Sequence, residues 1–205
     1  MASMAADMTV DDALYQEVRD QRLLGFLFFL ISDVIVFSSF IYGYIYLRST
    51  VMRWPPPGIE PAALYMAGVN SIVLFGSGAT MHYAMEFFKH GDKRKFVGFM
   101  IATVILGLGF LGGQAFEYFN LLHAGTTWPS SIYGASFFTL TGLHGFHVFI
   151  GVVWLLTMAV AGIKGKIGSS RALSVELCGL YWHFVDIVWV VIFTLIYLMR
   201  TINRA

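Results

Sequence analysis

The chain has 205 residues, of which 58% are hydrophobic and only 12% are charged, and its formal net charge is +1. A soluble domain of this length could not bury so large a share of apolar side chains, and a net charge this close to zero argues against a nucleic-acid partner. The single cysteine, Cys178, excludes both a disulfide within the chain and a CxxC metal motif. The composition therefore predicts an integral membrane protein.

The first segment of the chain, residues 1–22, is acidic and polar. It has no basic stretch followed by an apolar core, so it does not have the pattern of a cleavable signal peptide. We predict a cytoplasmic N-terminal tail over residues 1–22 that leads directly into the first apolar run.

Five apolar runs follow, and each is near or above the ~20 residues that a helix needs to cross a bilayer. We predict helices at about 23–47, 63–88, 96–122, 133–161 and 177–199. The segments between them are rich in proline, glycine and basic residues, as in "RSTVMRWPPPGIEP" and "KHGDKRK". The runs are too long for membrane strands and do not alternate between polar and apolar residues. The sequence thus predicts an all-α integral membrane bundle of five transmembrane helices over residues 23–200, followed by a short tail at 201–205.

The distribution of lysine and arginine predicts how the bundle is oriented in the membrane. One side carries nine of these residues: Arg19, Arg22, Lys89, Lys93, Arg94, Lys95, Lys164, Lys166 and Arg171. The other side carries four: Arg48, Arg53, Arg200 and Arg204. Because the more basic loops stay in the cytoplasm, the count predicts a cytoplasmic N-terminus and a periplasmic C-terminus.

Several polar and ionisable residues lie inside the predicted helices. An Asp at the centre of a membrane helix costs roughly 2.5–3.5 kcal/mol, so such groups tend to face protein, pair with each other or line a cavity. On three helices they share one face: Gln114 with Glu117, His144 with His147, and Glu176 with His183 and Asp186. We expect these three polar seams to face each other inside the bundle.

Three interpretations of the polar seams are open from the residues alone. They can form interhelical hydrogen bonds that serve packing only. They can belong to a small proton-coupled transporter, because buried carboxylates act in proton relays, although the sequence has no inverted repeat. They can ligate a haem or a metal in a catalytic redox subunit, although no two histidines have the i, i+4 spacing and no thiolate completes a ligand set. The third interpretation is the least favoured, so we predict no metal ligand in the chain.

The basic residues of the cytoplasmic side are candidates for binding lipid headgroups. Anionic lipid attracts each lysine or arginine near the membrane surface by about 1 kcal/mol. We therefore expect an ordered phospholipid headgroup near Lys164, Lys166 and Arg171, or near Lys93 and Arg94 in the "KHGDKRK" loop.

Four stretches of the sequence resemble subunit III of the haem–copper terminal oxidases, and together they reach from about residue 22 to residue 200. The most specific are "TGLHGFHVFIG" (141–151) and "LYWHFVDIVW" (180–189), which are similar to two signature stretches of that family. "GGQAFEYFNL" (112–121) and "FLISDVIVFSSFIYGYIYLR" (29–48) are similar to its preceding motif and its first shared helix. The number of helices resembles the short bacterial form of the subunit.

The resemblance implies a non-catalytic subunit of an aerobic respiratory oxidase that reduces O2 to water and pumps protons in the bacterial plasma (inner) membrane. Such a subunit would hold no redox cofactor and no catalytic residue, with haem and copper in partner subunits. It would contact the catalytic subunit I directly, with subunit II and other oxidase subunits in the same complex. It would bind phospholipid and support proton uptake and durability during turnover. His183 and Asp186 would then be structural groups between the fourth and fifth helices.

Asp33 departs from the pattern of most cytochrome c oxidases in the family, in which a glutamate follows the serine at this place. The aspartate resembles quinol oxidase subunits III, so the electron donor can be cytochrome c or a quinol. Asp33 lies about 15 Å into the first helix at 1.5 Å per residue, near mid-membrane, where an ionised carboxylate is poorly solvated. It can be a neutral acid at a helix contact, or a buried acid that faces the catalytic subunit and influences proton delivery or durability.

Overall fold

The computed structural model describes residues 10–167 and 172–199, with side chains from Gln16 onward. These residues contain no strand and form five long helices: α1 (Val10–Ser49), α2 (Leu64–Lys89), α3 (Lys93–His123), α4 (Ile132–Ile163) and α5 (Ala172–Phe193), which continues as the short π-helical segment η2 (Thr194–Leu198). All five are long and apolar enough to cross a membrane. The prediction of an all-α bundle of five transmembrane helices is confirmed.

Helix α1 is longer than the apolar run that predicted it. The run begins at residue 23, but the helix begins at Val10, so part of the segment predicted as a tail over residues 1–22 is helical. Glu17 and Arg19 are good helix formers, so the backbone continues its hydrogen-bonded spiral through this polar segment. Hydropathy marks only the part of a helix that meets lipid, and it therefore misses polar turns beyond that part. The predicted tail at 201–205 lies outside the described residues.

A capped turn joins α2 to α3. The Asp92 carboxylate accepts a hydrogen bond from the backbone N–H of Lys95 at 3.0 Å and lies 3.3 Å from the Lys95 ammonium. These contacts, the backbone N–H above all, hold the pKa of Asp92 below its usual value. Gly91, immediately before the cap, has φ +75°, which residues with a side chain rarely adopt. Gly91 and Asp92 therefore set where α2 ends and α3 begins.

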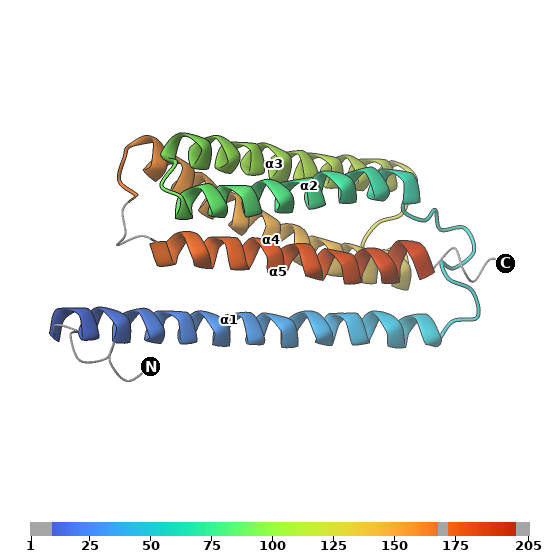
Figure 1. Cartoon of the computed structure of the whole chain (residues 1–205). Coiled ribbons are helices and arrows are strands. Elements are labelled where there is room, and N and C mark those ends of the chain that lie inside the picture. The colour runs from blue at the N-terminus through green and yellow to red at the C-terminus, as the bar shows by residue number, and fades with distance from the viewer. Residues whose placement is uncertain (1–9, 168–171, 200–205) are drawn as a thin grey trace.

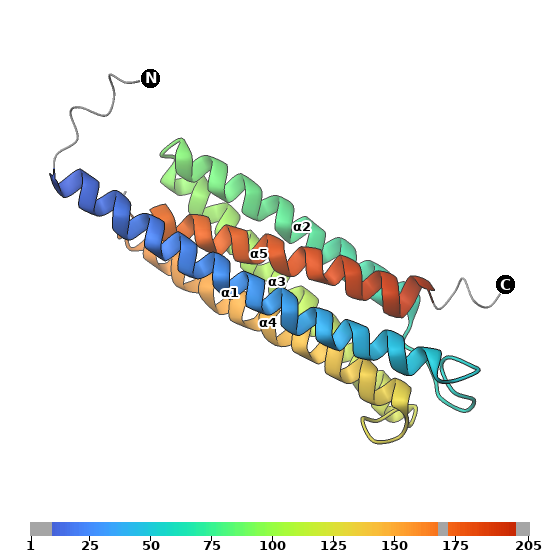
Figure 2. The same ribbon diagram turned by 90° about the horizontal axis from the view of Figure 1, so that it is seen from below.

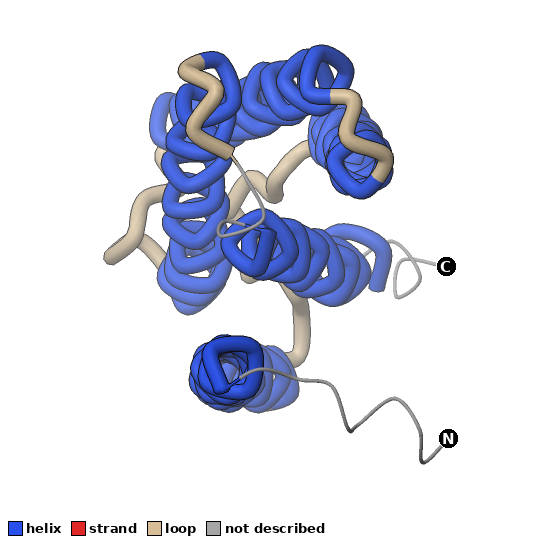
Figure 3. Tube along the Cα trace, turned by 60° about the vertical axis from the view of Figure 1, so that its left-hand side comes forward, coloured by secondary structure: helices blue, strands red, loops and turns tan. Residues whose placement is uncertain are grey.

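Helices α2 to α5 form the body of the bundle, and α1 lies along one side of it (Figures 1 and 2). The most extensive contact is between α2 and α3, whereas α1 packs mainly on α4 and α5. Viewed more nearly along the helices, α1 stands clear of α2 and α3 (Figure 3). One face of α1 is therefore packed against the bundle, and most of its surface is not.

The start of α1, the α2–α3 turn and the end of α4 lie at the same end of the bundle (Figure 1). We call it the basic end, because it carries Arg19, Arg22, Lys89, Lys93, Arg94, Lys95, Lys164 and Lys166. α1 begins and α5 ends at opposite ends of the bundle, as an odd number of crossings requires. The assignment of the basic end to the cytoplasm stays a prediction from the charge count.

Trp182 of α5 joins four helices at the centre of the bundle. Its side chain is fully buried, and its indole N–H donates a hydrogen bond to the Ser77 hydroxyl of α2 at 3.0 Å. The ring lies against Gly107 of α3 and Gly151 of α4, where an added Cβ would stand 2.8 Å from it in each case. The absence of side chains at these two glycines is what allows α3 and α4 to approach the indole.

Trp189, two turns further along α5, repeats this arrangement on a smaller scale. Its indole N–H donates to the Ser71 hydroxyl of α2 at 2.8 Å, and its ring meets the Phe110 ring of α3 edge-on at 4.8 Å between centroids. Two indoles on one face of α5 therefore fix the register of α5 against α2. In a bilayer, where apolar contact between helices gains little over contact with lipid, close packing and hydrogen bonds of this kind hold helices together.

We expect Gly151→Ala to destabilise the bundle, because the new methyl group would overlap the Trp182 ring. Overpacking of this kind costs about 1–3 kcal/mol. Gly145→Ala is a matched control on the same helix, since a Cβ there meets no atom within 4 Å. The measurement is the temperature at which buried Cys178 becomes reactive to a thiol label in the detergent-solubilised protein. Equal labelling temperatures for the two variants would contradict the role of Gly151.

Candidate functional site

Asp33 and His147, which the sequence placed on different helices, face each other between α1 and α4. Both are largely buried, and His147 Nε2 lies 3.7 Å from Asp33 Oδ2. His147 Nδ1 is 2.8 Å from the Leu143 carbonyl oxygen, so this nitrogen carries a proton and donates it. Nε2 and Asp33 Oδ2 thus face each other, but no hydrogen bond joins them in the described part of the chain.

Gln114 and Glu117 of α3 form a second polar group, together with a tyrosine that the sequence analysis did not select. Gln114 Nε2 donates to Glu117 Oε2 at 3.2 Å, and the Tyr197 hydroxyl of η2 donates to the same oxygen at 2.8 Å. All three side chains are buried. Tyr197 lies three helical turns beyond Asp186 on the same face, and this spacing is the signal that could have identified it.

His183 and Asp186 form a third pair at the contact between α5 and α2. His183 Nδ1 lies 3.7 Å from Asp186 Oδ2, and that oxygen occupies the space that a side chain at Gly78 of α2 would need. The expectation that these two residues lie between α4 and α5 is therefore wrong. The glycine on α2 leaves room for a carboxylate, and α5 turns its polar face to that space.

His144 does not join His147, although the two share a face of α4. Its ring stacks on Trp189 at 5.0 Å and meets Phe110 edge-on at 5.7 Å. It is fully buried, and neither ring nitrogen has a hydrogen-bond partner in the described part of the chain. Glu176 is exposed and pairs with Arg19 of α1 at 3.6 Å. The expectation that three seams face each other is wrong, because α4 and α5 each contact several neighbours and their polar residues go to different ones.

The buried groups form separate pairs instead of one centre. Among the residues that the structure describes, no group of three or more His, Cys, Asp or Glu side chains could hold a metal ion. Each pair joins two helices or lies at a helix contact, and each is built from an acid with a nearby donor or imidazole. Such pairs can hold helices in register and can take up or release a proton. They are not arranged to bind a substrate together.

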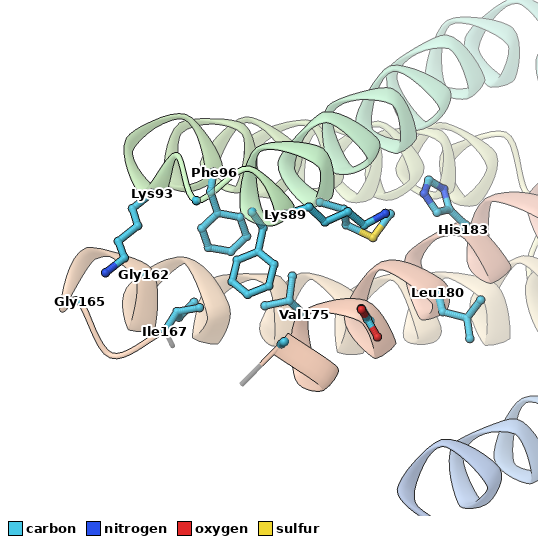
Figure 4. A pocket seen from close by; sticks show the side chains of 14 residues that line it. Lys89, Lys93, Phe96, Gly162, Gly165, Ile167, Val175, Leu180 and His183 are labelled. Atoms are coloured by element: carbon cyan, nitrogen blue, oxygen red, sulfur yellow. The ribbon is translucent and has the colours of Figure 1, made fainter. Parts of the chain in front are cut away.

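A cavity of about 660 Å³ opens at the basic end, between the α2–α3 turn and the facing ends of α4 and α5 (Figure 4). Its lining residues are Met85, Phe88, Lys89, Gly91, Lys93, Phe96, Gly162, Gly165, Ile167, Ala172, Val175, Glu176, Leu180 and His183. Of the residues predicted to bind lipid headgroups, only Lys93 belongs to this lining. Arg94, Lys164 and Lys166 are exposed nearby on the same end, and Arg171 lies outside the described residues. Lys89, the first residue of the "KHGDKRK" loop that the prediction named as a whole, also belongs to the lining.

Comparison with known proteins places this arrangement in one family. Residues 2–201 match the family described as cytochrome c oxidase subunit III. A protein of Thermostichus vulcanus named cytochrome c oxidase subunit 3 is 34% identical over 198 residues, which is 96% of this chain and 96% of that protein. Proteins of the same name from a Synechocystis strain and a Bacillus strain are 35% and 34% identical, over 88% and 89% of this chain and 76% and 87% of their own lengths.

We expect Tyr197→Phe to destabilise the contact between α3 and the end of α5. The change removes one donor from the buried Glu117 carboxyl group, and a loss of that kind costs about 1–3 kcal/mol. Tyr42→Phe is the control, since Tyr42 is 70% exposed on α1. Labelling of Cys178 on heating should occur at a lower temperature in the Tyr197 variant only. An unchanged temperature would show that this hydroxyl contributes nothing to the bundle.

Proposed function

Because the chain belongs to the cytochrome c oxidase subunit III family, we propose that it stabilises the catalytic subunit of a bacterial respiratory oxidase and supports proton uptake during turnover. The chain is a subunit of a haem–copper oxidase and crosses the membrane several times. In the proposal it lies in the inner membrane and contacts subunit I directly, with subunit II and other subunits in the same complex. Haem and copper belong to those partners, and this chain contributes helices, bound phospholipid and protonatable groups.

The observation that carries the proposal is the pair formed by Asp33 and His147. The two side chains lie 3.7 Å apart between α1 and α4, and the hydrogen bond from Nδ1 to the Leu143 carbonyl keeps Nε2 turned to the carboxyl group. Movement of a proton between the two side chains changes both charges and leaves the net charge of the pair unchanged. Exchange of a proton with a neighbouring subunit changes the net charge of the pair by one, so in the proposal that subunit supplies the compensating charge.

The same pair bears on the electron donor. The aspartate at position 33, where most of the family has a glutamate, resembles quinol oxidase subunits. In the structure this side chain faces His147 of the same chain, and the described residues around the pair form no site for an electron donor. The relatives from Thermostichus vulcanus, Synechocystis and Bacillus are all named cytochrome c oxidase subunit 3. We therefore favour cytochrome c over a quinol as the electron donor of the complex. Because the chain belongs to this family, we do not propose the alternative function of a proton-coupled transporter.

The outer surface of α1 supports the proposal that the chain works only inside a complex. Phe28, Ile35 and Tyr42 are between 62% and 70% exposed along this helix. Only the opposite face of α1, with Asp33 and Phe37, is packed on the bundle. A helix held by one face depends on lipid or on a partner subunit to cover the others.

We expect the Asp33→Asn oxidase to start at the wild-type rate and to lose activity after fewer turnovers. Asparagine keeps the shape of the side chain but takes up no proton, and it leaves the His147 imidazole without a counter-ion. The measurement is O2 consumption by the purified oxidase followed to inactivation, at several pH values around neutrality. Asp20→Asn on the exposed polar part of α1 is the matched carboxyl-to-amide control. Wild-type rate and lifetime in the Asp33 variant would reduce this residue to a packing role.

The chain should also co-purify with a large haem-containing subunit and should aggregate or be degraded when it is produced alone. The physical reason is the weakly packed α1 and the large apolar surface that it presents. Affinity purification from membranes, followed by absorption spectra and size-exclusion chromatography, checks both halves of this prediction. A monodisperse, heat-resistant lone chain in mild detergent would contradict it.

A further inference from the structure

A second cavity, of about 530 Å³, is formed by the last turn of α1 and the loop that joins α1 to α2. This loop lies at the end of the bundle opposite the basic end and projects beyond the ends of the helices (Figures 1 and 2). The exposed wall of the cavity is mainly polar, and its lining residues are Arg48, Val51, Met52, Arg53, Trp54, Pro55, Pro56, Pro57, Gly58 and Ile59. A ligand there would be held mainly by charge and hydrogen bonds, not by apolar burial.

The loop around this cavity is fixed to the bundle on both sides of its proline run. The Trp54 indole N–H donates a hydrogen bond to the Tyr44 hydroxyl at 3.1 Å. Beyond the prolines, the Thr126 hydroxyl donates to the Glu60 carbonyl oxygen at 3.0 Å. The three prolines at 55–57 restrict their own backbone, because each ring fixes φ. The cavity is therefore preformed, and a ligand would lose little free energy in ordering the loop.

Arg48 and Arg53 give the cavity two positive charges that no acid neutralises. Arg48 donates one N–H to the Met199 carbonyl oxygen at 2.9 Å, which leaves its other guanidinium donors for a ligand. Arg53 is exposed. From Gln16 to residue 199, with 168–171 outside the description, neither arginine forms an ion pair. Glu60, the acid that follows in the same loop, lines a different, smaller cavity.

Two guanidinium groups in a preformed polar cavity are suited to carboxylates, because the planar fork of arginine donates two parallel hydrogen bonds to such a group. A phospholipid is the less suitable occupant. Its acyl chains need an apolar groove beside the charges, whereas this wall is mainly polar and the loop stands beyond the helix ends. The volume is also larger than a single small anion requires. A short acidic stretch of polypeptide matches the charge, the polarity and the size.

We propose that this cavity binds an acidic segment of another subunit, with carboxylates paired to Arg48 and Arg53. The inference deepens the proposed function, on which it rests for the presence of partner subunits around the chain. It adds a polar contact outside the membrane to the apolar contacts that α1 offers within it. The partner is defined by its chemistry: at least one aspartate or glutamate side chain that reaches the α1–α2 loop.

The test is a zero-length cross-link in the purified, intact oxidase. Arg53→Lys keeps the positive charge and supplies an amine, which a water-soluble carbodiimide joins to a carboxylate in contact with it. The natural lysines all lie at the basic end, so an amide bond at position 53 is unambiguous: Lys89, Lys93, Lys95, Lys164 and Lys166. We expect peptide mass spectrometry to find position 53 joined to an aspartate or glutamate of another oxidase polypeptide.

Two further variants separate the cavity from its surroundings. His123→Lys places an amine at the exposed end of α3, at the same end of the bundle but outside the lining, and should give no cross-link to that segment. Arg48→Gln, added to Arg53→Lys, removes the second guanidinium and should lower the cross-link yield by about tenfold, because hydrogen bonds to charged groups are lost. The labelling temperature of Cys178 in each variant shows whether the bundle itself is unchanged.

Several results would overturn the proposal. They are the absence of a cross-link from position 53, a cross-link only to Glu60 of the same chain, and an equal yield from position 123. A fourth is the loss of a bound phospholipid from the Arg53→Glu oxidase in native mass spectrometry without any protein cross-link at position 53. That result would assign the arginines to a lipid headgroup.

The proposed function fails in a different way. If the wild-type chain does not purify with a haem-containing subunit, the oxidase role is overturned whatever the cross-links are. The same reaction on the assembly so obtained would still decide whether an acid of another polypeptide lies against Arg53.

Discussion

The Trp182 indole is the contact on which the rest of the structure depends. One side chain of α5 touches α2 through a hydrogen bond to Ser77, and it touches α3 and α4 where Gly107 and Gly151 leave room for its ring. Lipid tails are as apolar as helix surfaces, so burial alone gives little preference for helix contact over lipid contact. Shape complementarity around the indole and its hydrogen bond supply that preference.

Because α5 is fixed at the centre, the polar residues of the bundle are distributed around it and do not meet at one point. His183 with Asp186 face α2, and Tyr197 reaches Glu117 on α3. Asp33 with His147 lie apart from these, where α1 packs on the bundle. Each pair is placed at a separate helix contact. That distribution is consistent with the proposed supporting role, and Asp33 is the buried acid that the loosely packed helix α1 itself carries.

Much of the fold could be predicted from the sequence, because the physics of membrane insertion acts locally. A run of about twenty apolar residues determines a helix without reference to any other part of the chain, since unpaired backbone groups are too costly in lipid. The five apolar runs therefore predicted five helices. The count of lysine and arginine residues predicted that the basic loops lie together on one side of the membrane. The family was also recognisable, because stretches such as 180–189 carry the packing residues Trp182 and Trp189 next to His183 and Asp186. The polar start of α1 was not predicted as helix, because a hydropathy pattern identifies only the apolar part of a helix that contacts lipid.

What only the tertiary structure decided is which residues meet. Helical spacing shows that His144 and His147 share a face of α4, but a face in a bundle borders two neighbours, and these histidines go to different ones. The contact of Asp186 with α2 depends on Gly78, a residue more than a hundred positions away that carries no chemical signal in the sequence. The cavity beside Lys89 and Lys93 likewise arises from four helix ends that are separated along the chain. Partners of this kind are set by how whole helices pack, and packing is a property of the assembled bundle that no single stretch of the sequence encodes.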